Sequence, residues 1–338
     1  MPAAVEPYPL ILKPIFFDKV WGGRALERIG KDLPPPPAKV GESWEVADMG
    51  ATSASGAGGG AARSAIENGP LAGKTLGAAA ALWGDRMMGE HRSGGGFPLL
   101  VKFLDASENL SVQVHPSPAY AKLNQGASLK TECWYILSAA PGAMIYKGLK
   151  PGVTAASFAA HIRDGTVAGD MAAVPAVVGE CHNLPSGTVH ALGAGVVVAE
   201  VQTPSDTTFR VFDWGRTGRE LHVEQALACI DFARPAAPAA TRLVPGEASA
   251  RLVTTEFFTL DEHDIKPGDA VPIGDSSGPA VVIVLHGEAA IGDLLASGAA
   301  TDVRTGQTCV IPAFNAAWDS IIAGPHGARV LVARLIRR

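Results

Sequence analysis

The sequence predicts a mainly β protein: a jelly-roll barrel with a few helices, followed by a second, smaller β-sandwich or jelly-roll domain. Short apolar or alternating runs recur along the chain, and Gly, Pro, Asn and Asp separate them. Many short strands with regular turn signals are typical of sandwiches and jelly rolls. The chain has 338 residues, of which 47% are hydrophobic and 18% charged, which suits a globular protein with a substantial core.

A few segments depart from the strand pattern. The Pro-rich residues 33–39 predict a stiff extended connector, and residues 50–64, rich in Gly, Ala and Ser, predict a flexible loop. Residues 73–89 predict a helix that is closed by Gly. Residues 154–170 predict a second helix, for which Thr154 is a suitable N-cap because its hydroxyl can accept a bond from a free backbone N–H.

The remaining runs predict the strands of two domains. Those of the larger domain are residues 98–104, 109–115, 130–137, 143–147, 188–192, 195–202 and 207–214. Those of the smaller domain are residues 251–259, 280–285, 287–291, 308–311 and 329–336. The Pro/Ala stretch at 233–242 is the best boundary, so we expect a barrel domain with short helical segments over 1–235 and a smaller all-β domain over 243–338.

Composition excludes several functional classes. The formal net charge is −5 and no Lys/Arg cluster follows a phosphate backbone, so we expect no nucleic-acid partner. The N-terminus is a poor signal peptide, and no run of about 18 apolar residues predicts a membrane span. We expect a cytoplasmic protein, a monomer or weak homodimer, whose partner is a small molecule. Four widely spaced cysteines predict reduced, mostly buried thiols: Cys133, Cys181, Cys229 and Cys309.

Polar side chains occupy predicted strand faces where apolar ones are usual. In the run 109–115, alternation places Ser111, Gln113 and His115 on one face and apolar residues on the other. The run 130–137 likewise places Lys130 and Glu132 on the face of Trp134 and Ile136.

The run 195–202 places Glu200 among valines, and the following strand carries Arg210. A buried charge is costly unless it is paired, hydrogen-bonded or bound to an ion, so these positions are candidate site residues.

One segment has the spacing of the second cupin motif. Gly179, Pro185, Gly187 and His190 follow the pattern G-x5-P-x-G-x2-H, in which a tight turn starts a strand and the His points into the barrel. The Asn expected next is Ala194 here. The first cupin motif is altered as well: Gln-x-His replaces His-x-His at residues 113–115, and the Glu follows 17 residues later, at 132.

These altered motifs resemble one family closely, type I mannose-6-phosphate isomerase, and the compact length resembles its short bacterial branch. The similarity runs through most of the chain. Its blocks are VWGGRAL (20–26), GESWEVAD (41–48), LLVKFLDASENLSVQVHPSPAYA (99–121), LKTECWYIL (129–137), GTVHALGAGVVVAEVQTPSDTTFRVFDWGR (187–216), EFFTL (256–260) and VLHGEAAI (284–291).

The resemblance implies a metal site. In the family the metal is held by Gln, His, Glu and a second His, which fall here on Gln113, His115, Glu132 and His190. Two imidazole nitrogens and two oxygens suit one Zn²⁺ per chain, although other divalent metals also accept this set. A shared ion with bonds of roughly 2 Å requires the side chains of Gln113 and His190 to lie within about 8 Å of each other.

The resemblance also implies roles around the metal. Arg210 matches an arginine held near the reacting carbons, and Glu200 matches an acidic pocket residue. The expected substrate-binding residues are Lys102, Ser111, Lys130 and Arg216. The implied reaction interconverts mannose 6-phosphate and fructose 6-phosphate through an enediol, which requires a base that moves a proton between C1 and C2. That base is open between Glu200, a water held by the metal, and a residue from another loop.

Two other functions remain alternatives at this point. A non-catalytic or differently specific sugar-binding cupin would bind ligand without this turnover. A metal oxygenase on the same scaffold would require iron, and the Gln-containing ligand set favours the isomerase instead.

Overall fold

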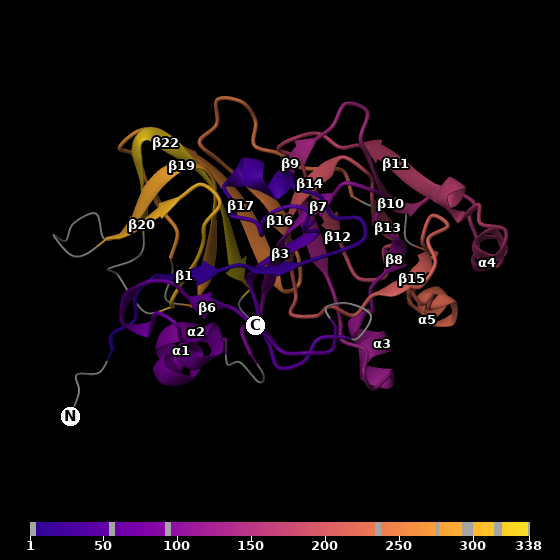
Figure 1. The fold of residues 1–338 in the computed structure, drawn as a ribbon, viewed down its shortest axis with the longest axis horizontal. Coiled ribbons are helices and arrows are strands. Elements are labelled where there is room, and N and C mark those ends of the chain that lie inside the picture. The colour runs from indigo at the N-terminus through magenta and orange to yellow at the C-terminus, as the bar shows by residue number, and fades with distance from the viewer. Residues whose placement is uncertain are drawn as a thin grey trace.

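The structure is a computed structural model that describes residues 5–53, 58–91, 96–233, 238–274, 277–292, 300–313 and 320–336. Its strands form two lobes along the long axis of the molecule (Figure 1). The mainly β prediction is confirmed, because antiparallel sheets build both lobes and only short helices accompany them.

Two sheets form the first lobe. The five-stranded sheet has the order β11 (Met171–Pro175), β10 (Met144–Leu149), β13 (His190–Leu192), β8 (Val112–Val114) and β15 (Phe209–Phe212). The six-stranded sheet has the order β12 (Cys181–Leu184), β9 (Glu132–Ala139), β14 (Val196–Gln202), β7 (Leu100–Ala106), β3 (Glu42–Val46) and β2 (Ile15–Phe17). All neighbours in both sheets are antiparallel.

The two sheets enclose a shared core, as a cupin-type barrel requires. Trp134 and Ile136 of β9 pack in one cluster with Ile145 of β10 and Leu192 of β13. Alternate residues of β9, such as Tyr135, belong instead to the core that continues into the second lobe. The predicted alternation along this strand is therefore confirmed, because each face meets a different core.

Helices cover the outer face of the five-stranded sheet. α4 (Ala155–Arg163) and α5 (Val223–Cys229) pack Phe158 and Ala226 against the outward valines of β8. Thr154 caps α4 as expected, in a capping box with Ser157. The helix is shorter than the predicted 154–170, since its end continues only as the 3₁₀ turn η3 (Val167–Asp170).

The other helices, α1 to α3, lie in the first 123 residues of the chain. The predicted helix over 73–89 is split into α1 (Leu76–Trp83) and α2 (Asp85–Met88), because Gly84 has a φ of 53° that no continuous helix accommodates. α3 (Pro118–Leu123) begins directly after β8. The short 3₁₀ turns are η1 (Ala25–Ile29) and η2 (Gly69–Leu71).

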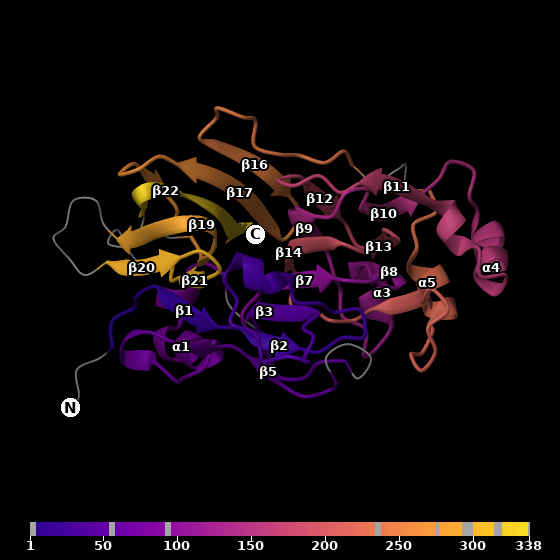
Figure 2. The same cartoon turned by 45° about the horizontal axis from the view of Figure 1, so that its top comes forward.

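The second lobe is one nine-stranded sheet that curls around its own core (Figure 2). Its order is β16 (Ser249–Thr254), β17 (Phe258–Ile265), β22 (Ser320–Leu335), β19 (Ala280–Gly292), β21 (Thr308–Ile311), β1 (Leu10–Lys13) and β6 (Ala65–Ile66). Two more strands join it beside this path: β18 (Ala270–Pro272) on β22 and β20 (Thr301–Arg304) on β19.

The second sheet takes strands from both ends of the chain. β1 pairs with β21, with Leu10 opposite Val310, so the N-terminal strand crosses the expected boundary at 233–242. The division into domains 1–235 and 243–338 stays a prediction, and residues 234–237 of its boundary lie outside the described residues. The predicted strands 280–285 and 287–291 are one long strand, β19, and the predicted strand 251–259 contains the turn between β16 and β17.

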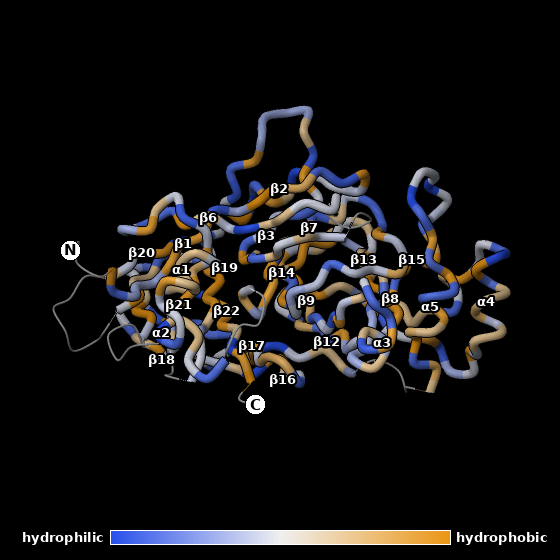
Figure 3. Tube along the Cα trace, turned by 90° about the horizontal axis from the view of Figure 1, so that it is seen from below, coloured by the Kyte–Doolittle hydropathy of each residue, from blue (hydrophilic) through white to orange (hydrophobic). Residues whose placement is uncertain are grey.

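Hydrophobic residues gather along the strands, including β14 and β22 (Figure 3). The four cysteines are buried and form no disulfide bond, as the sequence predicts. The predicted loop 50–64 differs from the structure at its end, where Ala62–Arg63 form β5 and pair with β4 (Asp48–Met49); residues 54–57 of the predicted loop lie outside the described part. Among the residues described, no helix is long and apolar enough to cross a membrane.

Candidate active site

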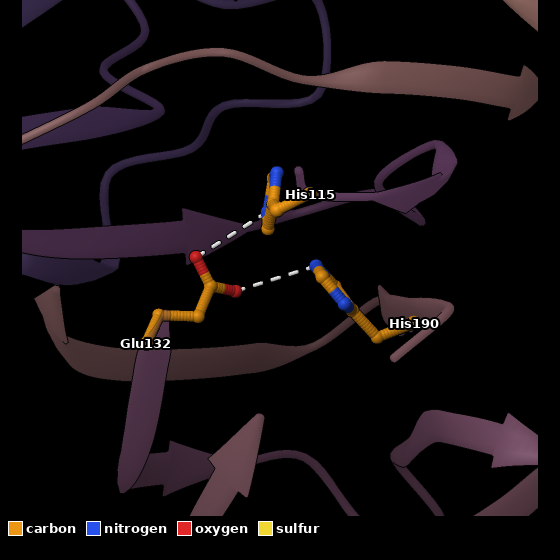
Figure 4. A group of neighbouring side chains, drawn as sticks. All are labelled: His115, Glu132 and His190. Carbon is orange, nitrogen blue, oxygen red and sulfur yellow. Dashed lines mark ion pairs between the residues drawn. The ribbon is translucent and has the colours of Figure 1, made fainter. Parts of the chain in front are cut away.

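The four predicted metal ligands converge from separate strands. Gln113 lies on β8 and His115 immediately follows that strand, while Glu132 and His190 are the first residues of β9 and β13. Gln113 and His190 are direct partners in the five-stranded sheet, and Glu132 comes from the opposite sheet. Figure 4 shows the carboxylate of Glu132 directed between the two imidazoles.

The distances between these groups are short. Glu132 Oε2 lies 3.4 Å from His115 Nε2, and Glu132 Oε1 lies 3.3 Å from His190 Nε2. The side-chain nitrogen of Gln113 lies 3.4 Å from His190 Nε2, well within the 8 Å limit set by a shared ion. One ligand atom from each of His115, Glu132 and His190 lies within 4.8 Å of the others.

Backbone carbonyls orient both imidazoles. Nδ1 of His115 lies 2.9 Å from the carbonyl of Thr207, and Nδ1 of His190 lies 2.9 Å from that of Thr188. A neutral imidazole donates from one nitrogen only. Because Nδ1 of each ring donates to a carbonyl, Nε2 of each ring keeps a free lone pair, and this lone pair faces Glu132. Burial and the nearby Lys130 charge lower the pKa of His115 to about 3, which keeps its ring neutral.

The group fits a divalent cation on its own chemistry. Nε2 of His115 and Oε1 of Glu132 are buried and have no hydrogen-bond partner in the described part of the chain. Burial raises the pKa of Glu132, but the charge of Lys130 at 2.7 Å outweighs burial and holds it well below its usual range, so the carboxylate is charged. Rotating the Gln113 amide by 180° would turn its oxygen toward the same centre. Two imidazoles, a carboxylate and an amide oxygen suit Zn²⁺ and other divalent ions.

A cavity of about 260 Å³ opens beside this group. Six of the predicted site residues line it: Lys102, Ser111, Gln113, Lys130, Glu200 and Arg210. The cavity wall also contains charged and polar residues that the sequence did not single out, among them Lys19, Glu42, Asp206, Thr208 and Arg219.

Lysines and carboxylates alternate along one side of the cavity. Lys130 contacts Glu132 at 2.7 Å and Glu200 at 3.9 Å, and Lys102 contacts Glu200 at 3.5 Å and Glu42 at 3.7 Å. Burial alone would raise the pKa of Glu42, but the adjacent lysines lower it to about 2. Burial and the charge of Glu132 instead raise the pKa of Glu200. Glu200 is therefore the carboxyl group of this row that most readily carries a proton.

Arg210 reaches the cavity from β15, where its strand partner is Gln113. Its Nη1 donates to the carbonyl of Glu220 at 2.9 Å, and its Nε is buried without a hydrogen-bond partner among the described residues. Arg210 therefore has a donor available beside the group of metal-type ligands, which supports its predicted place near the reacting atoms.

The structure places Arg216 away from the other predicted residues. Its guanidinium binds Asp213 at 2.7 Å, the carbonyl of Asn109 at 2.7 Å and the carboxylate of Glu108 at 3.4 Å. It is absent from the cavity wall, whereas Arg219, on the same Asp213 carboxylate, is part of it. A substrate-binding role for Arg216 stays a prediction.

Two residues of the cavity wall, Glu42 and Arg219, were not predicted from the sequence, and the sequence contains a signal for only one of them. Glu42 lies in the block GESWEVAD, where it is a charged residue beside buried strand residues. The same argument that made Glu200 a candidate site residue could have identified it. Arg219 lies after β15 in a polar turn with no periodicity, so only the three-dimensional arrangement brings it to the cavity.

Comparisons with known proteins agree with this arrangement. Residues 10–137 match the model of the phosphomannose isomerase type I catalytic domain. The chain is 34% identical over 328 residues to a mannose-6-phosphate isomerase of Streptococcus mutans, with 92% of this chain and 94% of that protein covered. It is 36% identical over 230 residues to mannose-6-phosphate isomerase ManA of Bacillus subtilis, with 66% and 68% covered.

Solved structures show the same fold. A crystal structure of the mannose 6-phosphate isomerase from Bacillus subtilis superposes with a TM-score of 0.81 at 29% identity, covering 96% of this chain and 99% of that one. A variant of phosphomannose isomerase from Salmonella typhimurium shares the fold at 17% identity, with a TM-score of 0.75 and coverage of 97% and 100%. The extent of these matches shows that the chain belongs to the type I mannose-6-phosphate isomerase family.

Proposed function

We propose that this protein is a metal-dependent isomerase that interconverts mannose 6-phosphate and fructose 6-phosphate through an enediol. The observation that carries the proposal is the convergence of Gln113, His115, Glu132 and His190 beside a charged, sugar-sized cavity. The membership of the chain in the family supports the choice of substrate.

The four converging side chains would hold one divalent ion, which we propose is Zn²⁺. When bound, this ion would polarise the substrate carbonyl and stabilise the negative charge that develops on its oxygen. The protein contributes two neutral imidazoles already fixed by the carbonyls of Thr188 and Thr207, so few rotamers need ordering when the ion binds.

The remaining residues divide the other tasks. Arg210 lines the cavity and has a buried Nε donor with no partner among the described residues, so it would orient the substrate oxygens at C1 and C2. Glu200 has an Oε1 that accepts no hydrogen bond from the described residues, and its raised pKa suits a group that takes and returns a proton. We therefore propose Glu200 as the carrier of the proton between the two carbons.

The lysines hold this carboxyl group and the sugar in place. Lys102 and Lys130 both contact Oε1 of Glu200, and Ser111, the residue before β8, lines the same cavity. These three residues supply hydrogen-bond donors along the path that sugar hydroxyl groups would occupy.

Metal analysis combined with an isomerase assay tests the proposal. The purified protein should contain close to one divalent ion per chain and convert mannose 6-phosphate to fructose 6-phosphate. A chelator should abolish turnover, and one equivalent of Zn²⁺ should restore it. Binding of the sugar phosphate without turnover under full metal loading would contradict the proposal and support the non-catalytic alternative.

A further inference from the structure

Charge is distributed unevenly around the cavity. On one side, each lysine has a carboxylate partner within 2.7–3.9 Å: Lys19, Lys102 and Lys130 with Glu42, Glu132 and Glu200. A substrate dianion gains little from lysines that carboxylates already neutralise.

Three arginines lie together elsewhere at the site, and the cavity that two of them line also has the carboxylates of Asp18 and Asp206 in its wall. Arg210, Arg216 and Arg219 surround one buried carboxylate, Asp213, which binds the last two directly. The only other acidic contact of these arginines is with the side chain of Glu108, among the residues that the structure describes, and that side chain is 56% exposed. Water screens such an exposed pair, so the arginine group keeps a net positive charge.

Only Arg219 of the two arginines on Asp213 is equipped to bind a ligand. All three guanidinium nitrogens of Arg216 contact protein oxygens. Arg219 uses Nε, at 2.8 Å, and Nη2 to grip Asp213, while its Nη1 has no hydrogen-bond partner among the described residues. The carboxylate thus fixes the plane of a guanidinium that lines the cavity and still has a donor to offer.

We propose that Arg219, positioned by Asp213, binds the phosphate group of the sugar-phosphate substrate. Arginine suits this task because its planar fork matches phosphate oxygens and its charge is permanent. The inference rests on the proposed function for the identity of the substrate, and it assigns the anion-binding role to Arg219 instead of Arg216.

Burial gives the direction in which the substrate lies. His190 is 1% exposed and Arg210 is 5% exposed, whereas the side chain of Arg219 is 24% exposed. The sugar therefore enters with its C1–C2 end toward the buried ligand group and its phosphate at the cavity mouth. A dianion that keeps part of its hydration at the mouth avoids most of the cost of burying two charges.

Replacement of Arg219 tests the assignment with inorganic phosphate as the probe. Arg219→Gln should raise the Kd for phosphate, measured by calorimetry, and the KM for mannose 6-phosphate by about 10-fold or more, the usual effect of a lost hydrogen bond to a charged group. The kcat should change much less, since the reacting carbons lie elsewhere. Arg219→Lys should fall between the wild type and the Gln variant, because it keeps the charge but loses the fork.

Arg163→Gln and Arg216→Gln serve as comparison variants, and a thermal melting curve shows whether each variant is folded. Arg163→Gln, on the exposed end of α4, should leave both constants unchanged. Unchanged phosphate affinity in a folded Arg219→Gln variant would overturn the inference, as would a larger loss in Arg216→Gln. Phosphate binding that depends on Arg219 in a protein without isomerase turnover would refute the proposed function and leave this inference standing.

Discussion

Lys31 and Glu45 form a buried ion pair, 2.5 Å between Nζ and Oε2, at the contact between the two lobes. Lys31 also donates to the carbonyl of Gly306, and Thr308 donates to the same carboxylate at 3.3 Å. Residues from the N-terminal segment, from β3 of the barrel and from the second lobe therefore meet at one charge pair. The pair lies three residues along β3 from Glu42 of the cavity, so it links the packing of the lobes to the position of the cavity wall.

We expect the loss of one partner to destabilise the protein strongly. Lys31→Met leaves the Glu45 carboxylate buried without its counter-charge, which typically costs about 3–5 kcal/mol. Urea unfolding followed by circular dichroism measures the change in the free energy of unfolding. The matched control is Lys266→Met, whose side chain is exposed and should change stability by less than about 0.5 kcal/mol. A similar small change in both variants would show that Lys31 and Glu45 are not essential partners.

The metal site makes a separate prediction about metal content. His190→Ala should lower the affinity for Zn²⁺ by at least about 100-fold and leave the purified protein with little bound metal, because a neutral ligand nitrogen is lost from a preformed group. Elemental analysis after dialysis measures this without any assay of activity. The control is His161→Ala. It removes a half-exposed imidazole of α4 that is paired with Asp170 of η3, and it should keep full metal content. Equal metal content in the two variants would contradict the assigned ligands.

Arg210 should affect the rate with little effect on metal content. Its loss removes a fixed cation beside the reacting carbons, so Arg210→Ala should lower kcat by about 10²- to 10³-fold, the typical effect of losing one preorganised donor. Steady-state kinetics on the metal-loaded variant measures the effect, and elemental analysis confirms the loading. A rise in KM with an unchanged kcat would show that Arg210 only binds the ground state.

Local sequence patterns predicted much of the fold and of the ligand group. The alternation of Gln113 and His115, and the turn before His190, depend on neighbouring residues and on strand geometry, so the sequence contains them directly. The resemblance to a known family added the role of these residues, together with Glu132, as ligands of one metal ion, and that role stays a prediction. Other features depend on contacts distant in sequence. The pairing of β1 with β21 joins residues about 300 apart in the sequence. Arg219 reaches the cavity only because residues distant in the sequence form the rest of the cavity wall around its turn. A single residue, Gly84, broke a helix that the surrounding alanines favour.

The last prediction concerns acid stability and His182 of β12. Burial and the charge of Lys147 lower the pKa of His182 to about 4 from 6.5, and the carboxylate of Glu180 at 3.6 Å does not reverse this shift. The unfolded chain therefore binds more protons than the folded protein between pH 6.5 and pH 4, so stability falls as the pH is lowered through this window. The shift predicts a loss of roughly 3 kcal/mol between pH 7 and pH 4 from this group. His182→Gln, which cannot titrate, should show a correspondingly shallower fall in the free energy of unfolding, measured with chelator present in both proteins so that metal loss does not contribute. A His182→Gln curve parallel to the wild type would show that this imidazole is not buried in its neutral form.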